Sequence, residues 1–147
     1  MLIRLATLDD LPVLCGLLDL LFAQEAEFQP DDAAQRRGLS RILENPAVGE
    51  ILVVEDGGQA VAMVSLLYSV STALGEPVAW LEDMVVAPSR RAGGTGSRLL
   101  EAAIAHARQR GCRRLTLLTD HDNQGAQRFY ARQGFAHSPM VPMRLML

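Results

Sequence analysis

Apolar residues recur along the first third of the chain with the spacing of a strand and then with that of helices. Residues 2–6 (LIRLA) alternate and predict a short strand, and residues 11–22 (LPVLCGLLDLLF) predict a helix that has Pro12 in its first turn. Residues 31–45 predict a second helix, because acidic residues open it and Asn45-Pro46 marks its end. We therefore expect one strand followed by two helices.

The middle of the chain predicts three strands in succession. Residues 50–70 (EILVVEDGGQAVAMVSLLYSV) hold two β-rich runs around Asp56-Gly57-Gly58, which is the pattern of a hairpin whose turn needs positive φ. Residues 78–88 (VAWLEDMVVAP) predict a further strand that Pro88 ends.

The last third predicts a helix, a strand, a second helix and one or two closing strands. These are residues 97–111 (SRLLEAAIAHARQRG), 113–120 (RRLTLLTD), 123–134 (NQGAQRFYARQG) and 135–147 (FAHSPMVPMRLML). The helix at 97–111 joins two strands that should be parallel neighbours. The whole order predicts a single α/β domain over residues 1–147, with a mixed sheet covered by helices.

Composition narrows the classes of function. The 147 residues, 49% of them hydrophobic, suffice for one buried core, and a formal charge of −3 argues against a broad nucleic-acid-binding face. The chain has no lysine, which excludes lysine Schiff-base chemistry and a Walker-type phosphate loop. Cys15 and Cys112 lack metal-ligand spacing, so we expect reduced thiols and no metal. Without a basic leader or a run of ~18 apolar residues, we expect a cytoplasmic protein that does not bind membranes.

A glycine-rich segment lies between the strand at 78–88 and the helix at 97–111. Gly93, Gly94 and Gly96 leave backbone N–H groups bare at the positive end of a helix dipole, where phosphate binds well. A glycine turn that serves only tight packing is the alternative. A dinucleotide-binding fingerprint is excluded, because its third glycine would fall at Leu99 and its strand should open the fold.

With its neighbours, this segment resembles the GNAT-type N-acetyltransferases, which use acetyl-coenzyme A (acetyl-CoA). Residues 91–96 (RAGGTG) meet the family pattern Gln/Arg-x-x-Gly-x-Gly/Ala, and residues 123–135 are similar to the family's second hallmark, an Asn that opens a helix closing on Phe-Tyr-x-x-x-Gly-Phe. The resemblance implies a GNAT-like mixed sheet, mostly antiparallel and six- to seven-stranded. About four helices should flank it, and its central parallel strand pair should splay apart.

The resemblance also implies which residues bind acetyl-CoA. The pantetheine arm should run along the backbone of Met84, Val85 and Val86, with the N–H of Met84 directed at the thioester carbonyl. Asn123 should cap the last helix and touch the cofactor. The pyrophosphate should lie on the loop amides of Arg91, Ala92, Gly93, Gly94, Thr95, Gly96 and Ser97.

Two residues are candidates for proton transfer. Glu82 precedes Met84 by two residues and should share its face of the strand, and the LEDMVV stretch resembles the Leu-Glu-Asp of spermidine/spermine acetyltransferases, so Glu82 is our candidate base. Asp83, on the opposite face, is the lesser candidate, and a plain surface carboxylate is the alternative for Glu82. Tyr130 matches the family tyrosine that hydrogen-bonds the sulfur, which implies that it is a general acid or stabilises the leaving thiolate, although Phe129-Tyr130 could simply be a packing face.

The acceptor should meet the early helices, and we expect Phe22, Glu25 and Phe28, with Glu82, to bind it. The acidic residues could attract a cationic amine, although a solvated helix end explains them equally. The sequence thus predicts acetyl transfer to a primary amine of a small molecule. The alternatives are a non-catalytic acyl-CoA-binding module and an acetyltransferase of protein N-termini. The closing residues 139–147 are apolar enough to pair across a homodimer or to finish the chain's own sheet.

Overall fold

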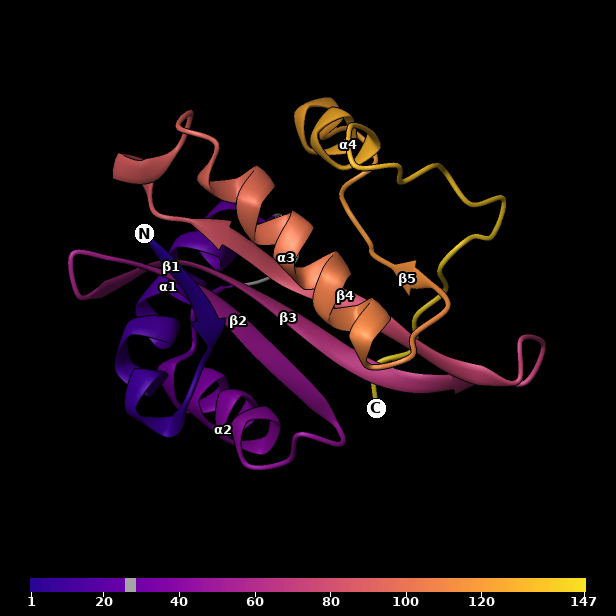
Figure 1. The fold of residues 1–147 in the computed structure, drawn as a ribbon, viewed down its shortest axis with the longest axis horizontal. Helices are drawn as coiled ribbons and strands as arrows, with labels where there is room; N and C mark the ends of the chain where they lie inside the picture. The colour runs from indigo at the N-terminus through magenta and orange to yellow at the C-terminus, as the bar shows by residue number, and fades with distance from the viewer. Residues whose placement is uncertain (26–28) are drawn as a thin grey trace.

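The computed structural model describes residues 1–25 and 29–147, and its elements follow the expected order (Figure 1). Two 3-10 turns, Leu8–Asp10 and Pro88–Arg90, precede α1 and α3. No helix of the described ranges has the length and apolar character needed to cross a membrane. The strands and helices are β1 (Leu2–Leu5), α1 (Leu11–Gln24), α2 (Asp32–Leu43), β2 (Gly49–Asp56), β3 (Gln59–Ser71), β4 (Glu76–Val86), α3 (Thr95–Gln109), β5 (Leu115–Thr116) and α4 (Gln124–Ala131).

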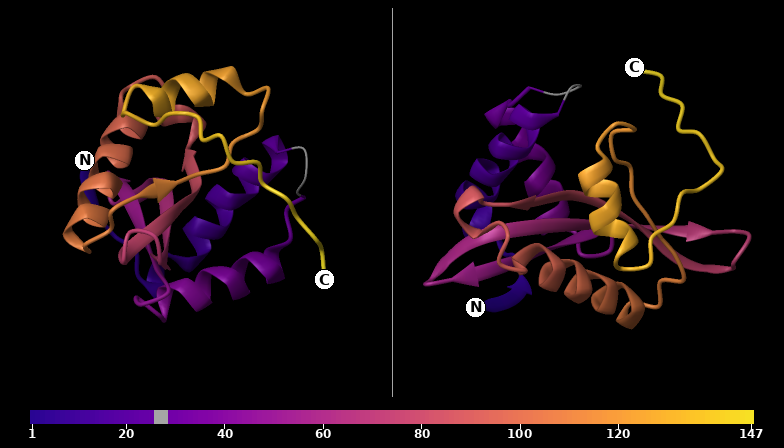
Figure 2. Two further views of the ribbon diagram at one scale, coloured as in Figure 1. Left: turned by 90° about the vertical axis from the view of Figure 1, so that its right-hand side faces the viewer. Right: turned by 90° about the horizontal axis from the view of Figure 1, so that it is seen from above.

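The strands form one mixed sheet between two layers of helices, as expected for this α/β fold class. The spatial order is β1-β2-β3-β4-β5, and only β4 and β5 pair in parallel. Helices α1 and α2 cover one face and α3 and α4 the other (Figure 2). One core cluster joins Leu66 of β3 to Leu99 and Leu100 of α3, and the other joins Met63 of β3 to Leu14 of α1.

Local chemistry explains most of the element boundaries. Pro12 lies in the first turn of α1, where its missing N–H costs nothing. Gly57 and Gly58 take φ values of 62° and 78° in the β2–β3 turn, and Gly111 takes 82° just after α3. The predictions of the hairpin and of the end of α3 are therefore confirmed.

The sheet has five strands among the described residues, where six to seven were expected. The strand expected over residues 113–120 is reduced to Leu115–Thr116, and residues 135–147 form no strand. Every residue from Ala136 onward is exposed, and Figure 2 shows this segment running out from the body beyond the layer of α1 and α2. Alternation alone does not make a strand, because a strand needs a neighbour for its backbone groups.

The central parallel pair splays, as the resemblance implied. β4 and β5 pair only through Ala79 with Leu115 and Trp80 with Thr116. β4 continues to Val86 after β5 has ended. The second half of β4 therefore has one edge without a strand partner in the described part of the chain.

Candidate functional site

A β-bulge lies in β4 beside this open edge. Met63 pairs with Val85 and Ser65 with Glu82, so Asp83 and Met84 together face a single residue of β3. Asp83 has φ of 52°, which is unusual for a residue with a side chain. The bulge therefore interrupts the regular alternation of side chains along β4.

The bulge corrects our expectation that Glu82 and Met84 share a face. Leu81 and Met84 both pack with the core cluster under α3. Asp83 instead lines a cavity between α1 and α2. Glu82 is exposed, and because it follows Leu81 in the strand it lies on the side opposite to Leu81, which is the side of this cavity. A spacing of two residues predicts a shared face only in a regular strand, and the extra residue here removes that rule.

Asp83 is the carboxylate whose environment is most altered. Partial burial, followed by the negative charges of Glu82 and then Glu25, raises its pKa to about 6. Two consecutive acidic residues within an otherwise apolar strand indicated this site in the sequence. From the sequence, however, we expected Glu82 and not Asp83 to be the base. In residues 1–25 and 29–147, no three His, Cys, Asp or Glu side chains group as metal ligands would.

The cavity next to Asp83 has a volume of about 290 Å³ and is largely apolar. Two of its polar residues are already engaged: Asp31 accepts the N–H of Ala34, and Gln35 bonds Asp19 and the backbone of α1. Asp83 and Asp31 are the two carboxylates of the lining, and Asp31 is the one that already caps α2. The apolar part of its lining comes from α1 and α2: Leu18, Phe22, Ala34, Gly38, Leu39 and Ile42.

The residues expected to bind the acceptor divide into three groups. Phe22 lines the cavity, and Glu25 lies near enough to Asp83 to raise its pKa. Glu82 is adjacent to Asp83 but exposed. Phe28 lies outside the described residues. The sequence missed the contribution of α2, because the lining depends on how α2 packs against α1 and no motif in α2 marks it.

The glycine-rich loop meets the end of β4 at the start of α3. Residues 91–94 are exposed, and Gly94 (φ 80°) precedes the first residue of the helix. The N–H groups of Thr95, Gly96 and Ser97 have no partner inside the helix because they lie in its first turn. A side chain at Gly96 would meet Phe129 at 3.4 Å and Val86 at 3.5 Å. The loop thus presents bare amides where β4, α3 and α4 converge.

Two of the arginines beside this loop have partners within the protein. Arg90 forms an ion pair with Asp56 at 3.0 Å, and Nε of Arg91 donates to the carbonyl oxygen of Val86 at 2.9 Å. These contacts tie the loop to the β2–β3 turn and to the end of β4. The amides, rather than all the guanidinium groups, are therefore the part of the loop that is open to an anion.

Helix α4 places Tyr130 on the α3 side of the open edge. Tyr130 packs against the same core cluster as Met84, with its ring 5.1 Å from that of Phe129 and 5.7 Å from that of Phe135. Burial raises the pKa of the phenol to about 12, so Tyr130 stays protonated at neutral pH. Asn123 caps α4 as expected, since its Oδ1 accepts the N–H of Ala126 at 3.0 Å.

The chain is similar to known acetyltransferases. The model of the acetyltransferase (GNAT) family matches residues 16–135. The uncharacterized N-acetyltransferase YhfO of Bacillus subtilis is 35% identical over 85 residues, which are 58% of this chain and 57% of YhfO, so the match spans little more than half of that relative. The aminoalkylphosphonate N-acetyltransferase of Salmonella typhimurium is 31% identical over 136 residues, covering 92% of this chain and 85% of that protein.

A solved structure of a probable acetyltransferase shares the fold. It superposes with a TM-score of 0.86 over 100% of this chain and 98% of its own, at 24% identity.

The raised pKa of Asp83 predicts a pH-dependent stability. Below about pH 4 the carboxyl is protonated in both the folded and the unfolded chain, and stability is lost as the pH rises through about 6 because folding must then bury a charge. Asp83→Asn removes that cost and keeps a residue that tolerates positive φ. We expect it to raise the free energy of unfolding by about 1–3 kcal/mol at pH 8 and by little at pH 4.

Urea denaturation at several pH values measures this difference. Exposed Asp122 supplies the control, since Asp122→Asn should change little at either pH. A pH-independent effect of Asp83→Asn would contradict the buried-charge explanation.

Proposed function

The chain belongs to the acetyltransferase (GNAT) family, and we propose that it transfers an acetyl group from acetyl-CoA to the primary amine of a small molecule with an apolar body. The observation that carries this proposal is the position of the β4 bulge. On one side of the sheet Met84 packs with the core cluster that residues of α3 and α4 join, and on the other Asp83 lines the apolar cavity. One strand thus separates a place for the acyl donor from a place for the amine.

The residues around the loop fit acetyl-CoA, which supplies the activated acetyl group. The amides of residues 91–97 would hold the pyrophosphate at the positive end of α3. Gly96 keeps the junction of the loop with Val86 and Phe129 free of a side chain. The backbone of Met84, Val85 and Val86 would hydrogen-bond the pantetheine amides along the open edge of β4. The N–H of Met84, displaced from the ladder by the bulge, would face the thioester carbonyl.

Asp83 would remove the proton that keeps the amine from attacking. An alkyl amine has a pKa near ~10.4 and enters as an ammonium ion, which the charges of Asp83, Glu82 and Glu25 attract. With its pKa near 6, Asp83 is ionised at neutral pH and still basic enough to accept a proton. Burial raises that pKa most, and the charge of Glu82 would raise it further. The alternative, which we inferred from the sequence, is that Glu82 itself is the base. Variants of Asp83 and Glu82 distinguish the two.

The cavity favours an acceptor with an apolar body over an anionic one. Apolar side chains of α1 and α2 line most of its wall, and no arginine does so among the described residues. An aminoalkylphosphonate, the substrate named for the Salmonella relative, would meet Asp83 and Asp31 without a cation. A volume of about 290 Å³ suits one compact group, whereas a peptide N-terminus needs an open groove.

A thiol-release assay with acetyl-CoA tests the acceptor class. We expect a primary amine that carries an aryl or alkyl body to give the highest kcat/KM. Polyamines, aminoalkylphosphonates, aminoglycosides, amino acids and short peptides complete the panel. An aminoalkylphosphonate as the best substrate would overturn the acceptor proposal alone. Binding of acetyl-CoA with no thiol release from any amine would favour the non-catalytic module.

Kinetics of two variants separate the candidate bases. We expect kcat/KM of the unaltered enzyme to rise with pH through about 6, because Asp83 must lose its proton to act. Asp83→Asn should lower kcat about 10²–10⁴-fold, the range for loss of a general base. Glu82→Gln should keep most of the rate and move the rise to lower pH, because it removes a charge that raises the pKa of Asp83. The reverse pattern would assign the base to Glu82.

Tyr130, which packs against the same core cluster as Met84, would protonate the leaving thiolate. Tyr130→Phe should lower kcat by about 10²-fold and leave the dissociation constant of CoA nearly unchanged, since only a proton donor is lost. Tyr68→Phe is the matched control: its hydroxyl donates to Glu50 at 2.8 Å, and the change should leave kcat alone. An unchanged rate for Tyr130→Phe would return Tyr130 to a packing role.

A further inference from the structure

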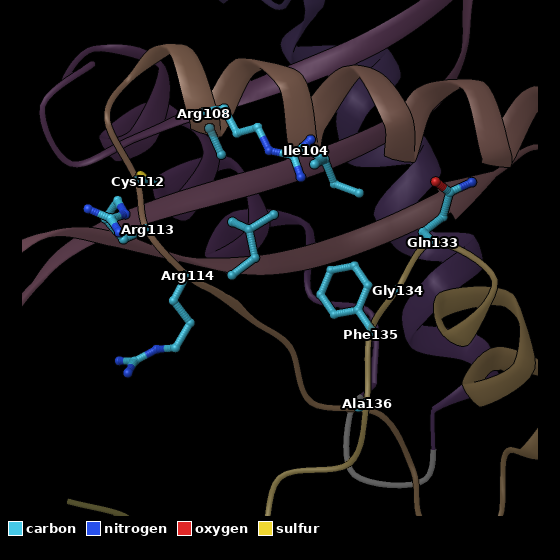
Figure 3. Close-up of a pocket in the computed structure, with 11 residues that line it drawn as sticks. Ile104, Arg108, Cys112, Arg113, Arg114, Gln133, Gly134, Phe135 and Ala136 are labelled. Carbon is cyan, nitrogen blue, oxygen red and sulfur yellow. The ribbon is translucent and has the colours of Figure 1, made fainter. Parts of the chain in front are cut away.

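A second cavity, of about 300 Å³, lies beside β5 and is lined by positive charges (Figure 3). Arg108, Arg113 and Arg114 line it, and within the described part of the chain its lining includes no carboxylate. Because like charges repel, a protonated amine is directed to the cavity beside Asp83 instead, here called the Asp83 cavity. The shape of the Asp83 cavity therefore decides which acceptor fits.

Gly38 lies on the face of α2 that lines the Asp83 cavity. Ala34 and Ile42, which are four residues before and after it, also line the cavity, so the three share one face of the helix. Gly38 is exposed, whereas Leu39 beside it is buried in the core. Gly38 therefore lies toward the mouth of the cavity, which is its solvent-exposed side, and the wall has no side chain there.

Neither the backbone nor the packing of α2 requires a glycine at this position. Gly38 lies in the interior of the helix, and its φ angle is not positive. A Cβ atom added to it would have no atom within 4 Å. An interior glycine destabilises a helix relative to alanine. The chain thus keeps an open space at the mouth of the cavity although this weakens the helix.

Hydrogen bonds fix the rotation of α2 against α1, so that α2 keeps this face toward the cavity. The Nε2 atom of Gln35 donates to Oδ1 of Asp19 at 2.9 Å and to the carbonyl oxygen of Cys15 at 3.2 Å. The Sγ atom of Cys15 donates to Oδ1 of Asp32 at 3.0 Å. Gln35 and Cys15 are both buried. A larger residue at position 38 is therefore not accommodated by turning the helix.

We propose that Gly38 sets the length of the apolar body that the acceptor amine carries. The ammonium group lies at Asp83, the body fills the cavity between α1 and α2, and its far end leaves through the mouth over Ala34 and Gly38. This inference rests on the function proposed above. It narrows the acceptor to primary amines with an unbranched apolar chain, because the opening is as wide as one missing side chain.

The direction of side chains in a helix explains how a residue at position 38 would act. The Cα–Cβ bonds of a helix tilt toward its N-terminus, so a side chain there would lean over Ala34, which carries only a methyl group. It would then close the mouth to a long chain and leave the part of the cavity beside Asp83 open.

Two measurements with unbranched alkylamines test this role of Gly38. One is thiol release from acetyl-CoA, and the other is calorimetric binding to the protein saturated with CoA, which has no acetyl group to transfer. In the unaltered protein, kcat/KM and affinity should rise about threefold to fourfold for each methylene from butylamine to octylamine, as burial of an apolar chain predicts. Gly38→Leu should lower the octylamine-to-butylamine ratio of both quantities at least about 10-fold.

Gly16→Leu is the matched control. Gly16 also lies in the interior of a helix, is exposed and has no atom within 4 Å of an added Cβ, but it does not line the cavity. Both substitutions should raise the midpoint of urea denaturation, because leucine favours a helix more than glycine does. Only Gly38→Leu should change the ratio, which compares two amines on the same protein and is therefore independent of the folded fraction. Ala34→Leu should act in the same direction as Gly38→Leu.

The outcomes separate this inference from the proposed function. A ratio that Gly38→Leu leaves unchanged, or that Gly16→Leu lowers equally, would overturn the role of Gly38, while turnover of the amines would still support acetyl transfer. If no amine releases thiol, the proposed function fails and the calorimetric ratio alone decides. A preference for octylamine that Gly38→Leu removes then supports the role of Gly38, and the absence of such a preference overturns it.

Discussion

The backbone of β4 loses a strand partner on both edges over the same few residues, and the rest of the site depends on that loss. On one edge the bulge takes Asp83 and Met84 out of the ladder with β3, and on the other β5 parts from β4 after Trp80. Backbone N–H and C=O groups that lack a partner are costly unless water or a ligand satisfies them. An extended ligand with amide groups is one means of satisfying them, and a pantetheine arm is such a ligand.

The bulge also decides which chemistry faces which layer of helices. It sends Met84 to the side of α3 and α4, where the glycine loop and Tyr130 lie, and Asp83 to the side of α1 and α2. Because the apolar cavity there desolvates the carboxylate, the same packing that shapes an acceptor site raises the pKa of its base. Donor and acceptor would therefore approach the bulge from opposite faces of one sheet.

Local rules predicted the parts of the fold that local chemistry decides. Gly57-Gly58, Gly111 and the cap at Asn123 act through their own backbones or nearest neighbours, and the structure has them where the sequence indicated. The predicted side of β4 for Glu82 was wrong because alternation assumes regular strand pairing. Nothing in the sequence of β4 indicates where its register with β3 shifts. The strands predicted over residues 135–147 are absent for a related reason. These residues have the alternating pattern of a strand, but a strand forms only where a neighbouring strand pairs with its backbone groups.

A crystal structure of the protein with bound CoA shows directly whether the pantetheine arm occupies the open edge of β4. We expect the pyrophosphate on the amides of residues 91–97 and the pantetheine hydrogen-bonded to the backbone of Met84, Val85 and Val86. The sulfur should lie at the bulge, with Tyr130 on one side of the sheet and Asp83 on the other. A pantetheine arm that leaves this edge of β4 unpaired, or a sulfur remote from the bulge, would contradict it.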